Sequence, residues 1–134
     1  MKQLSIGSAY KFQPRQIVCL EHENTRLYTE VIEVVASRPV CWVRPVMLAV
    51  SIADNDPLVM ASSQQPTLYD LRQGADLLWP ATLFRPALDT EVIPLLVQLN
   101  DPDAHGEDHS EAHKQLNCFV RKVWQAYKSA FSAS

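Results

Sequence analysis

Two adjacent runs of residues with high β-propensity constrain the fold of this chain more than any other feature. The first covers residues 26–36 and the second residues 40–51, and valines recur through both. Valine and isoleucine lose rotamer freedom in a helix and pack well on a pleated surface, so each run is predicted to be a strand. Proline cannot continue a central ladder, so Ser37-Arg38-Pro39 is expected to turn the chain between them. The two strands should form a long antiparallel hairpin.

The register of this hairpin follows if its turn is centred next to Arg38. The expected pairs are Val34 with Cys41, Glu33 with Trp42, and Ile32 with Val43. One face of the hairpin should then be core and carry Ile32, Val34, Cys41, Val43 and Met47. The other should be half-exposed and carry Thr29, Glu33, Trp42 and Arg44. Pro45 predicts a bulge, a bend or an edge position in the second strand.

Several shorter strands are expected around the hairpin, because apolar runs alternate there with turn signals. Their predicted ranges are 16–20, 57–60, 68–72 and 76–79, and residues 81–85 are expected to form a turn followed by a final short strand. Many short strands of this kind are typical of a small barrel. We therefore expect residues 1–88 to form a small antiparallel β-barrel, SH3-like or OB-like, or a strongly bent sheet.

Two helices are expected after this β-rich part. Asp89 would cap the first, over residues 89–99, and Glu91 would place a second acid in its first turn, although Pro94 opposes a helix there. An acidic loop with a histidine is expected over residues 100–108. The second helix is predicted over 109–131.

The second helix has the clearest pattern in the chain. Asp108 and Glu111 are spaced as in a capping box, and apolar residues then recur at three- and four-residue steps. The apolar stripe consists of Leu116, Phe119, Val120, Val123, Trp124, Tyr127 and Phe131. The sheet, a partner or a second copy of the chain has to cover it, and we expect Val120, Val123 and Trp124 to pack on the sheet. The whole chain, 1–134, is expected to be one α+β domain.

Length and composition favour a cytoplasmic domain. With 134 residues, of which 47% are hydrophobic, the chain can build a core without disulfides or metal. No segment has the apolar core of a signal peptide or approaches the roughly 20 apolar residues of a membrane span. The three cysteines form no CxxC pair, which indicates reduced thiols in a reducing compartment.

Charge is unevenly distributed along the chain. Residues 1–50 carry a formal charge of +2, residues 51–108 carry −8 and residues 109–134 carry +3, for a net charge of −3. Proteins dedicated to nucleic acids usually show a dense basic footprint, because neutralising phosphates supplies most of their affinity. Nucleic acid is therefore an unfavoured partner.

Motifs of known catalytic chemistry are absent from the sequence. It contains no GxSxG, no phosphate-binding glycine loop, no dinucleotide fingerprint and no EF-hand loop, and it has 3 glycines in all. We assign no catalytic residue and no cofactor, and a non-catalytic role is favoured.

Histidines form the one cluster of metal-ligand type. His109 and His113 would share a face of the last helix, with His105 just before it. The pattern is not HExxH, and no cysteine stands at metal-finger spacing. Packing at the start of the helix is the favoured role for these histidines, and a divalent metal site is the alternative.

Cys118 is the cysteine with basic neighbours, namely Lys114, Arg121 and Lys122. Positive charge can activate a thiol, so a redox role is the alternative to that of an ordinary surface thiol. The ordinary surface thiol is favoured.

An aromatic and Arg-Pro phrase occurs twice, at residues 42–48 and 83–88. Arginine and tryptophan are common interface anchors, so the two copies could form a recognition groove. The favoured alternative is that each arginine pairs with Glu33 or an acidic loop while the proline ends a strand. The candidate partner-binding residues are Trp42, Arg44, Trp79, Phe84 and Arg85.

The segments LYDLRQGADLLWP at 68–80 and LFRPALDTEVIPLL at 83–96 resemble the small conserved hypothetical proteins of cyanobacteria. The resemblance covers the middle third of the chain. It implies a cyanobacterial cytoplasm and transfers no functional residue.

The expected function is that of a non-catalytic adaptor or regulatory subunit that binds another protein. The main rival is an RNA-binding small barrel, whose basic patch would consist of Arg15, Arg26, Arg38 and Arg44. A metal-dependent site at His105, His109 and His113 is a third class.

Overall fold

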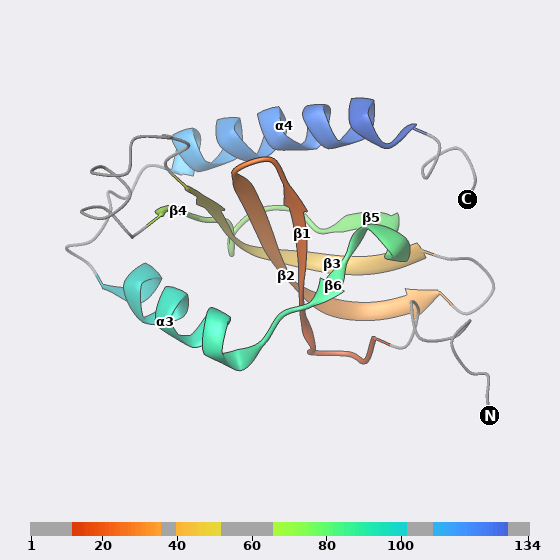
Figure 1. Ribbon diagram of the computed structural model, residues 1–134, viewed down its shortest axis with the longest axis horizontal. Coiled ribbons are helices and arrows are strands. Elements are labelled where there is room, and N and C mark those ends of the chain that lie inside the picture. Colours follow the sequence, from red (N-terminus) through yellow and green to blue (C-terminus); the bar gives the residue numbers. More distant parts are fainter. Residues whose placement is uncertain (1–11, 36–39, 52–65, 102–108, 129–134) are drawn as a thin grey trace.

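The computed structural model describes residues 12–35, 40–51, 66–101 and 109–128. In these ranges an antiparallel sheet carries one helix on each face (Figure 1). The elements in chain order are β1 (Ile17–His22), β2 (Thr25–Val35), β3 (Val40–Val50), β4 (Thr67–Asp70), β5 (Leu77–Pro80), the 3₁₀ turn η1 (Ala81–Leu83), β6 (Arg85–Pro86), α3 (Asp89–Asn100) and α4 (His109–Ala126).

The sheet is open rather than closed into a barrel. Its strand order is β4-β3-β2-β1-β6, and β5 also pairs with β3. Within the described ranges no pairing joins β6 to β4 or β5. The expected α+β class is confirmed, whereas the barrel is not. The strand expected over 57–60 lies outside the described residues.

The hairpin of β2 and β3 follows the predicted register only near its turn. Val34 pairs with Cys41 and Glu33 with Trp42, as expected. A β-bulge at Ile32 then makes Val31 the partner of Val43, so the prediction that Ile32 faces Val43 was wrong. The extra residue turns every earlier side chain of β2 to the other face. Thr29 is therefore buried and does not share a half-exposed face with Glu33.

Pro45 lies beside a second irregularity, as its residue type predicted. Tyr28 pairs with Met47 and Thr29 with Pro45, which leaves Val46 as the bulged residue. Pro45 also falls between the part of β3 that pairs with β5 and the part that pairs with β4. The bulge turns Met47 to the face of α3, so it does not share a face with Cys41 and Val43 as predicted.

Each helix covers one cluster of buried side chains. The cluster under α4 includes Val18, Leu20, Leu27, Val31, Cys41, Val43, Leu48, Trp79, Phe84, Ala112, Leu116, Phe119 and Val123. The cluster under α3 consists of Cys19, Tyr28, Met47, Ala49, Leu68, Val92, Leu95 and Leu99. Alternation of side chains along each strand divides the residues between the two clusters.

The buried stripe of α4 is narrower than the sequence predicted. Its fully covered members are Ala112, Leu116, Phe119 and Val123. Trp124 is 48% exposed, so its predicted place in the core was wrong, and Tyr127 is 37% exposed. Trp124 directly follows Val123, and successive helical residues are about 100° apart, so its side chain turns away from the sheet. Tyr127 lies just beyond Ala126, the last residue of α4, and its ring meets that of His22 edge-on. Phe131 lies outside the described residues.

Helix α3 begins with a different cap from the one predicted. Asp89 is the first helical residue and Leu88 is the N-cap. The Leu88 N–H donates to Glu91 Oε1 at 3.1 Å, so Glu91 rather than Asp89 satisfies this end. Pro94 stands inside the helix, where it removes one backbone donor. Neither of the described helices has the length and hydropathy that crossing a membrane requires.

Candidate partner-binding surface

Two of the predicted interface residues meet on the exposed face of β3. The Trp42 Nε1–H donates to Asp76 Oδ2 at 2.9 Å, and Arg44 Nε donates to Asp76 Oδ1 at 3.0 Å. Trp42 is 41% exposed, and its cross-strand neighbour Leu78 is also exposed. Hydrogen bonds from both donors lower the pKa of the Asp76 carboxyl, that from Arg44 most. Asp76 therefore holds Trp42 and Arg44 in place as a charged acceptor.

The other predicted residues have different surroundings. Trp79 and Phe84 are buried in the cluster under α4 and offer little surface to a partner. Arg85 lies on β6, which β1 and β2 separate from β3 and Arg44. The two Arg-Pro phrases therefore do not form one groove, and each arginine pairs with a nearby carboxylate instead. Arg44 pairs with Asp76 of a loop and not with Glu33.

Arg85 belongs to an ion-pair network that fixes the first turn of α3 to the sheet. Its guanidinium donates from Nη1 to Glu91 Oε1 and from Nη2 to Glu91 Oε2, both at 3.0 Å. The Tyr28 hydroxyl donates to Glu91 Oε2 at 2.7 Å, Arg26 Nη1 lies 3.8 Å from the same oxygen, and Arg85 Nη2 donates to Glu21 at 3.4 Å. Hydrogen bonds from Arg85 above all, and then from Tyr28 and the Leu88 N–H, lower the pKa of Glu91 to about 2. Glu91 thus joins β2, β6 and α3.

The basic patch expected for RNA is compensated in part by these same pairs. Arg44 pairs with Asp76, and Arg26 approaches Glu91. Arg38 lies outside the described residues. The charge left for a phosphate chain at this patch is smaller than the sequence suggested.

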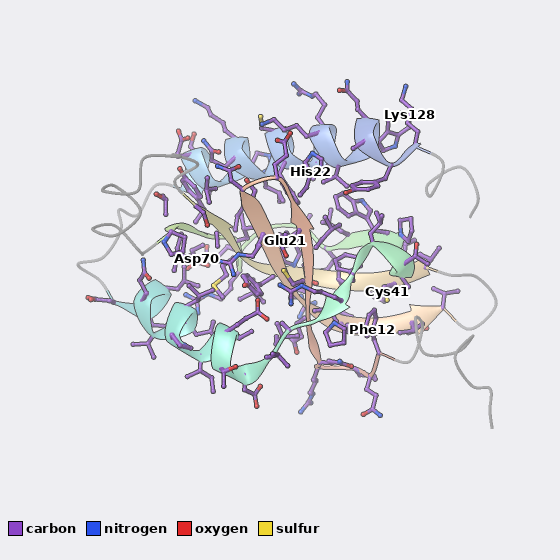
Figure 2. The ribbon with its side chains drawn as sticks, viewed as in Figure 1. Phe12, Glu21, His22, Cys41, Asp70 and Lys128 are labelled. Carbon is purple, nitrogen blue, oxygen red and sulfur yellow. The ribbon has the colours of Figure 1, made fainter. Side chains whose placement is uncertain are left out.

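The loop between β4 and β5 is anchored at both ends. At its start, Arg72 Nε and Nη2 donate to the two oxygens of Asp70 at 2.9 and 2.8 Å, and Arg72 Nη1 donates to Asn100 Oδ1 at 2.9 Å. At its end, Asp76 binds Arg44 and Trp42 as described above. Figure 2 shows Asp70 at the end of the sheet between the two helices. Residues 71–76 therefore form a wall whose position is fixed by strands and by the end of α3.

A groove of about 730 Å³ lies between this loop and α4, and we call it the α4 groove. Its apolar lining consists of Leu71, Ala75, Leu77, Ala112, Leu116 and Val120. Polar side chains at its margin are Asp70, Gln73, Ser110, His113, Lys114 and Asn117. An apolar interior with a polar margin is typical of a site that holds an apolar side chain of a ligand.

A second hollow of about 400 Å³ continues the α4 groove along the helix, and we call it the Trp124 shelf. Asn117 and Val120 line both hollows, and Arg121, Trp124, Gln125 and Lys128 line the shelf alone. The Lys128 ammonium lies 5.4 Å from the centre of the Trp124 ring, within cation–π range. Together the two hollows place an apolar track beside basic and aromatic groups.

The histidine cluster does not form a metal site in the part of the chain that the structure describes. No group of three or more ligand-type side chains gathers within those residues. His113 is exposed at the margin of the α4 groove, so the packing predicted for it at the start of the helix was wrong. His105 and the side chain of His109 lie outside the described residues.

Two of the three cysteines are buried and one is exposed. Cys19 and Cys41 are fully buried, and burial raises the pKa of the Cys19 thiol to about 12. Burial also raises the pKa of Cys41. Cys118 is exposed on α4. Thiolate chemistry in the folded protein is therefore restricted to Cys118 among the three.

The α4 groove was not predicted from sequence. Its loop wall carries ordinary turn residues, and its floor belongs to the apolar stripe of α4, part of which was expected to pack on the sheet. One signal was available in the sequence, because Trp124 directly follows Val123 and so lies to one side of the line that Phe119 and Val123 form on the helix.

No family model, no curated protein and no solved structure matches this chain.

Proposed function

We propose that this protein is a non-catalytic adaptor or regulatory subunit of the cytoplasm, and that it binds a segment of another protein in the α4 groove. The observation that carries the proposal is the anchoring of the groove wall. Ion pairs hold residues 71–76 at both ends, through Asp70 and Arg72 and through Asp76 and Arg44. A groove held open before binding spares its ligand the cost of ordering the walls.

The chemistry of the groove favours a protein segment. Leu71, Leu116 and Val120 can bury an apolar side chain, and each such side chain contributes roughly 1.5–3 kcal/mol when fully buried. The exposed Trp124 at the far end supplies an aromatic surface of the kind that dominates interface energies.

Trp42 and Arg44 have a different role in this proposal from the one the sequence suggested. They bind Asp76, which directly precedes Leu77 of the groove lining. They act as positioning residues that keep the wall in place, and direct contact with the partner is assigned to α4 and to residues 71–77.

Filling the groove should abolish binding without unfolding the protein. Asn117 is exposed and lines both hollows, so Asn117→Trp places a bulky side chain where the partner would lie. Lys122→Trp is the matched control, because Lys122 is exposed on the same helix and lines neither hollow. In affinity capture from lysate of the native cells, we expect the wild type and Lys122→Trp to recover the same protein. Asn117→Trp should recover at least tenfold less of that protein, and its thermal unfolding midpoint should stay within a few degrees of the wild type.

Retention of that protein by Asn117→Trp would contradict the proposed site. Recovery of no reproducible protein by the wild type at native abundance would contradict the adaptor function itself.

A further inference from the structure

The charged side chains along α4 indicate the chemistry of the partner more specifically than the apolar floor of the groove does. Residues 110–128 contain four Lys or Arg, at positions 114, 121, 122 and 128, and one carboxylate, Glu111. Glu111 Oε2 accepts a hydrogen bond from Gln115 Nε2 at 2.8 Å. Lys114, Arg121 and Lys122 have no carboxylate within ion-pair distance among the described residues. At these three residues α4 therefore carries positive charge that the described part of the chain does not neutralise, and Lys114 and Arg121 are the two that line the hollows.

Three of these basic residues are evenly spaced along the two hollows. Lys114 lines the α4 groove, and Arg121 and Lys128 line the Trp124 shelf. Each step is seven residues, or about two turns and 10.5 Å along the helix axis. The row runs beside the apolar track of Leu116 and Val120, because residues three and four apart share one side of a helix. The surface thus presents a row of apolar side chains next to a parallel row of basic side chains.

We infer that the partner segment is an acidic amphipathic helix, with apolar side chains in the α4 groove and carboxylates at about seven-residue intervals facing Lys114, Arg121 and Lys128. This inference rests on the proposed function and adds the chemistry of the partner. A helix laid along α4 repeats its side chains with the same rise, so one carboxylate every two turns meets each basic residue. Opposite charges at these positions fix the register and orientation of the segment.

The same surface suits a phosphate chain less well. The floor is apolar, and the opposite margin carries Asp70 rather than a second row of cations. Strands of nucleic acid are held by basic grooves with stacking aromatics, and they gain nothing from burying a phosphate beside leucine. A protein segment that is both apolar and acidic can contact the apolar floor and the basic side chains at the same time.

The inference can be tested by adding peptides to the isotope-labelled full chain and measuring the chemical shifts of its amides. Three synthetic helical peptides of equal length carry leucine on one face and, beside it, Glu, Gln or Lys at seven-residue intervals. We expect the Glu peptide to shift the amides of residues 71–77 and of α4, and to bind about tenfold more tightly than the Gln peptide at low salt. High salt should narrow that difference, since exposed pairs are screened.

Charge reversal gives the matched control. The double variant Lys114→Glu and Arg121→Glu should prefer the Lys peptide, whereas Lys122→Glu, away from both hollows, should keep the preference of the wild type. Equal binding of the Glu and Gln peptides would overturn the acidic partner and leave protein binding in the groove intact. Groove shifts on adding oligouridylate, with none from any peptide, would overturn the inference in favour of nucleic acid. If no probe shifts the groove, the inference also fails, and capture with Asn117→Trp decides the adaptor function separately.

Discussion

Phe119→Ala is expected to lower the free energy of unfolding by about 3–5 kcal/mol, a large share of the stability of an ordinary domain. Phe119 is 4% exposed and lies in the middle of the buried stripe of α4. Its removal leaves a cavity between α4 and the sheet that the neighbouring strands cannot fill without moving. Urea unfolding, followed by circular dichroism, measures the loss.

Trp124→Ala is the comparison that gives this prediction its meaning. Trp124 is 48% exposed, and its ring carries the Lys128 ammonium at 5.4 Å. A pair of this kind contributes about 0.5–1 kcal/mol at an exposed site, and about half of the Trp124 surface stays in water, so the variant should remain folded and lose much less stability than Phe119→Ala. Equal losses of stability for the two variants would contradict the placement of Phe119 against the sheet and of Trp124 at the surface.

Truncation after Gln115 removes Leu116, Phe119 and Val123 together, and we expect it to abolish cooperative unfolding.

Glu91→Gln is expected to lower the free energy of unfolding by about 2 kcal/mol at neutral pH. It should also make that free energy depend less on pH in the acid range. Glu91 accepts hydrogen bonds from Arg85, Tyr28 and the Leu88 N–H, and its side chain is 19% exposed. Its pKa in the folded protein is about 2, below its ordinary value of 4.5. The ionised group therefore contributes stability that is fully present above pH 4.5. That contribution is lost as the pH falls from 4.5 towards 2.

Unfolding midpoints between pH 7 and pH 2 test this prediction. The wild type should lose stability through the window from pH 4.5 to pH 2, and Glu91→Gln should lose less there because it has no charge to neutralise. Glu33→Gln is the control, since Glu33 is an exposed residue of the same sheet without a described partner. Parallel curves for the wild type and Glu91→Gln would show that the network does not stabilise the fold.

The sequence predicted the elements better than their contacts. The hairpin, the helix at 89–99 and the amphipathic helix follow from local patterns, and all three are present. The register failed at Ile32, because the β-bulge there carries no residue signal of the kind that Pro45 gave for the second one. Trp124 was misplaced because helical periodicity gives the width of an apolar stripe less precisely than its direction.

The candidate site shows the same limit. Trp42 and Arg44 were chosen for their residue types, and they do meet on one exposed strand. Their partner Asp76 is 34 and 32 residues away along the chain, a distance over which composition gives no guide. Phe84 and Trp79 were chosen on the same grounds and are core residues. The α4 groove exists only when the loop at 71–76 is folded beside α4, so no single segment encodes it.

Site-specific photo-crosslinking in intact cells tests most directly whether the α4 groove is the partner-binding surface. A photoreactive phenylalanine analogue at position 117 would lie in the groove, and the same residue at position 122 would lie outside it on the same helix. A third position, 93, samples the exposed apolar side of α3, where Ile93 is 56% exposed. We expect a discrete protein adduct from position 117 and none from positions 122 and 93. An adduct from position 93 without one from position 117, or equal adducts from all three, would contradict the proposed site.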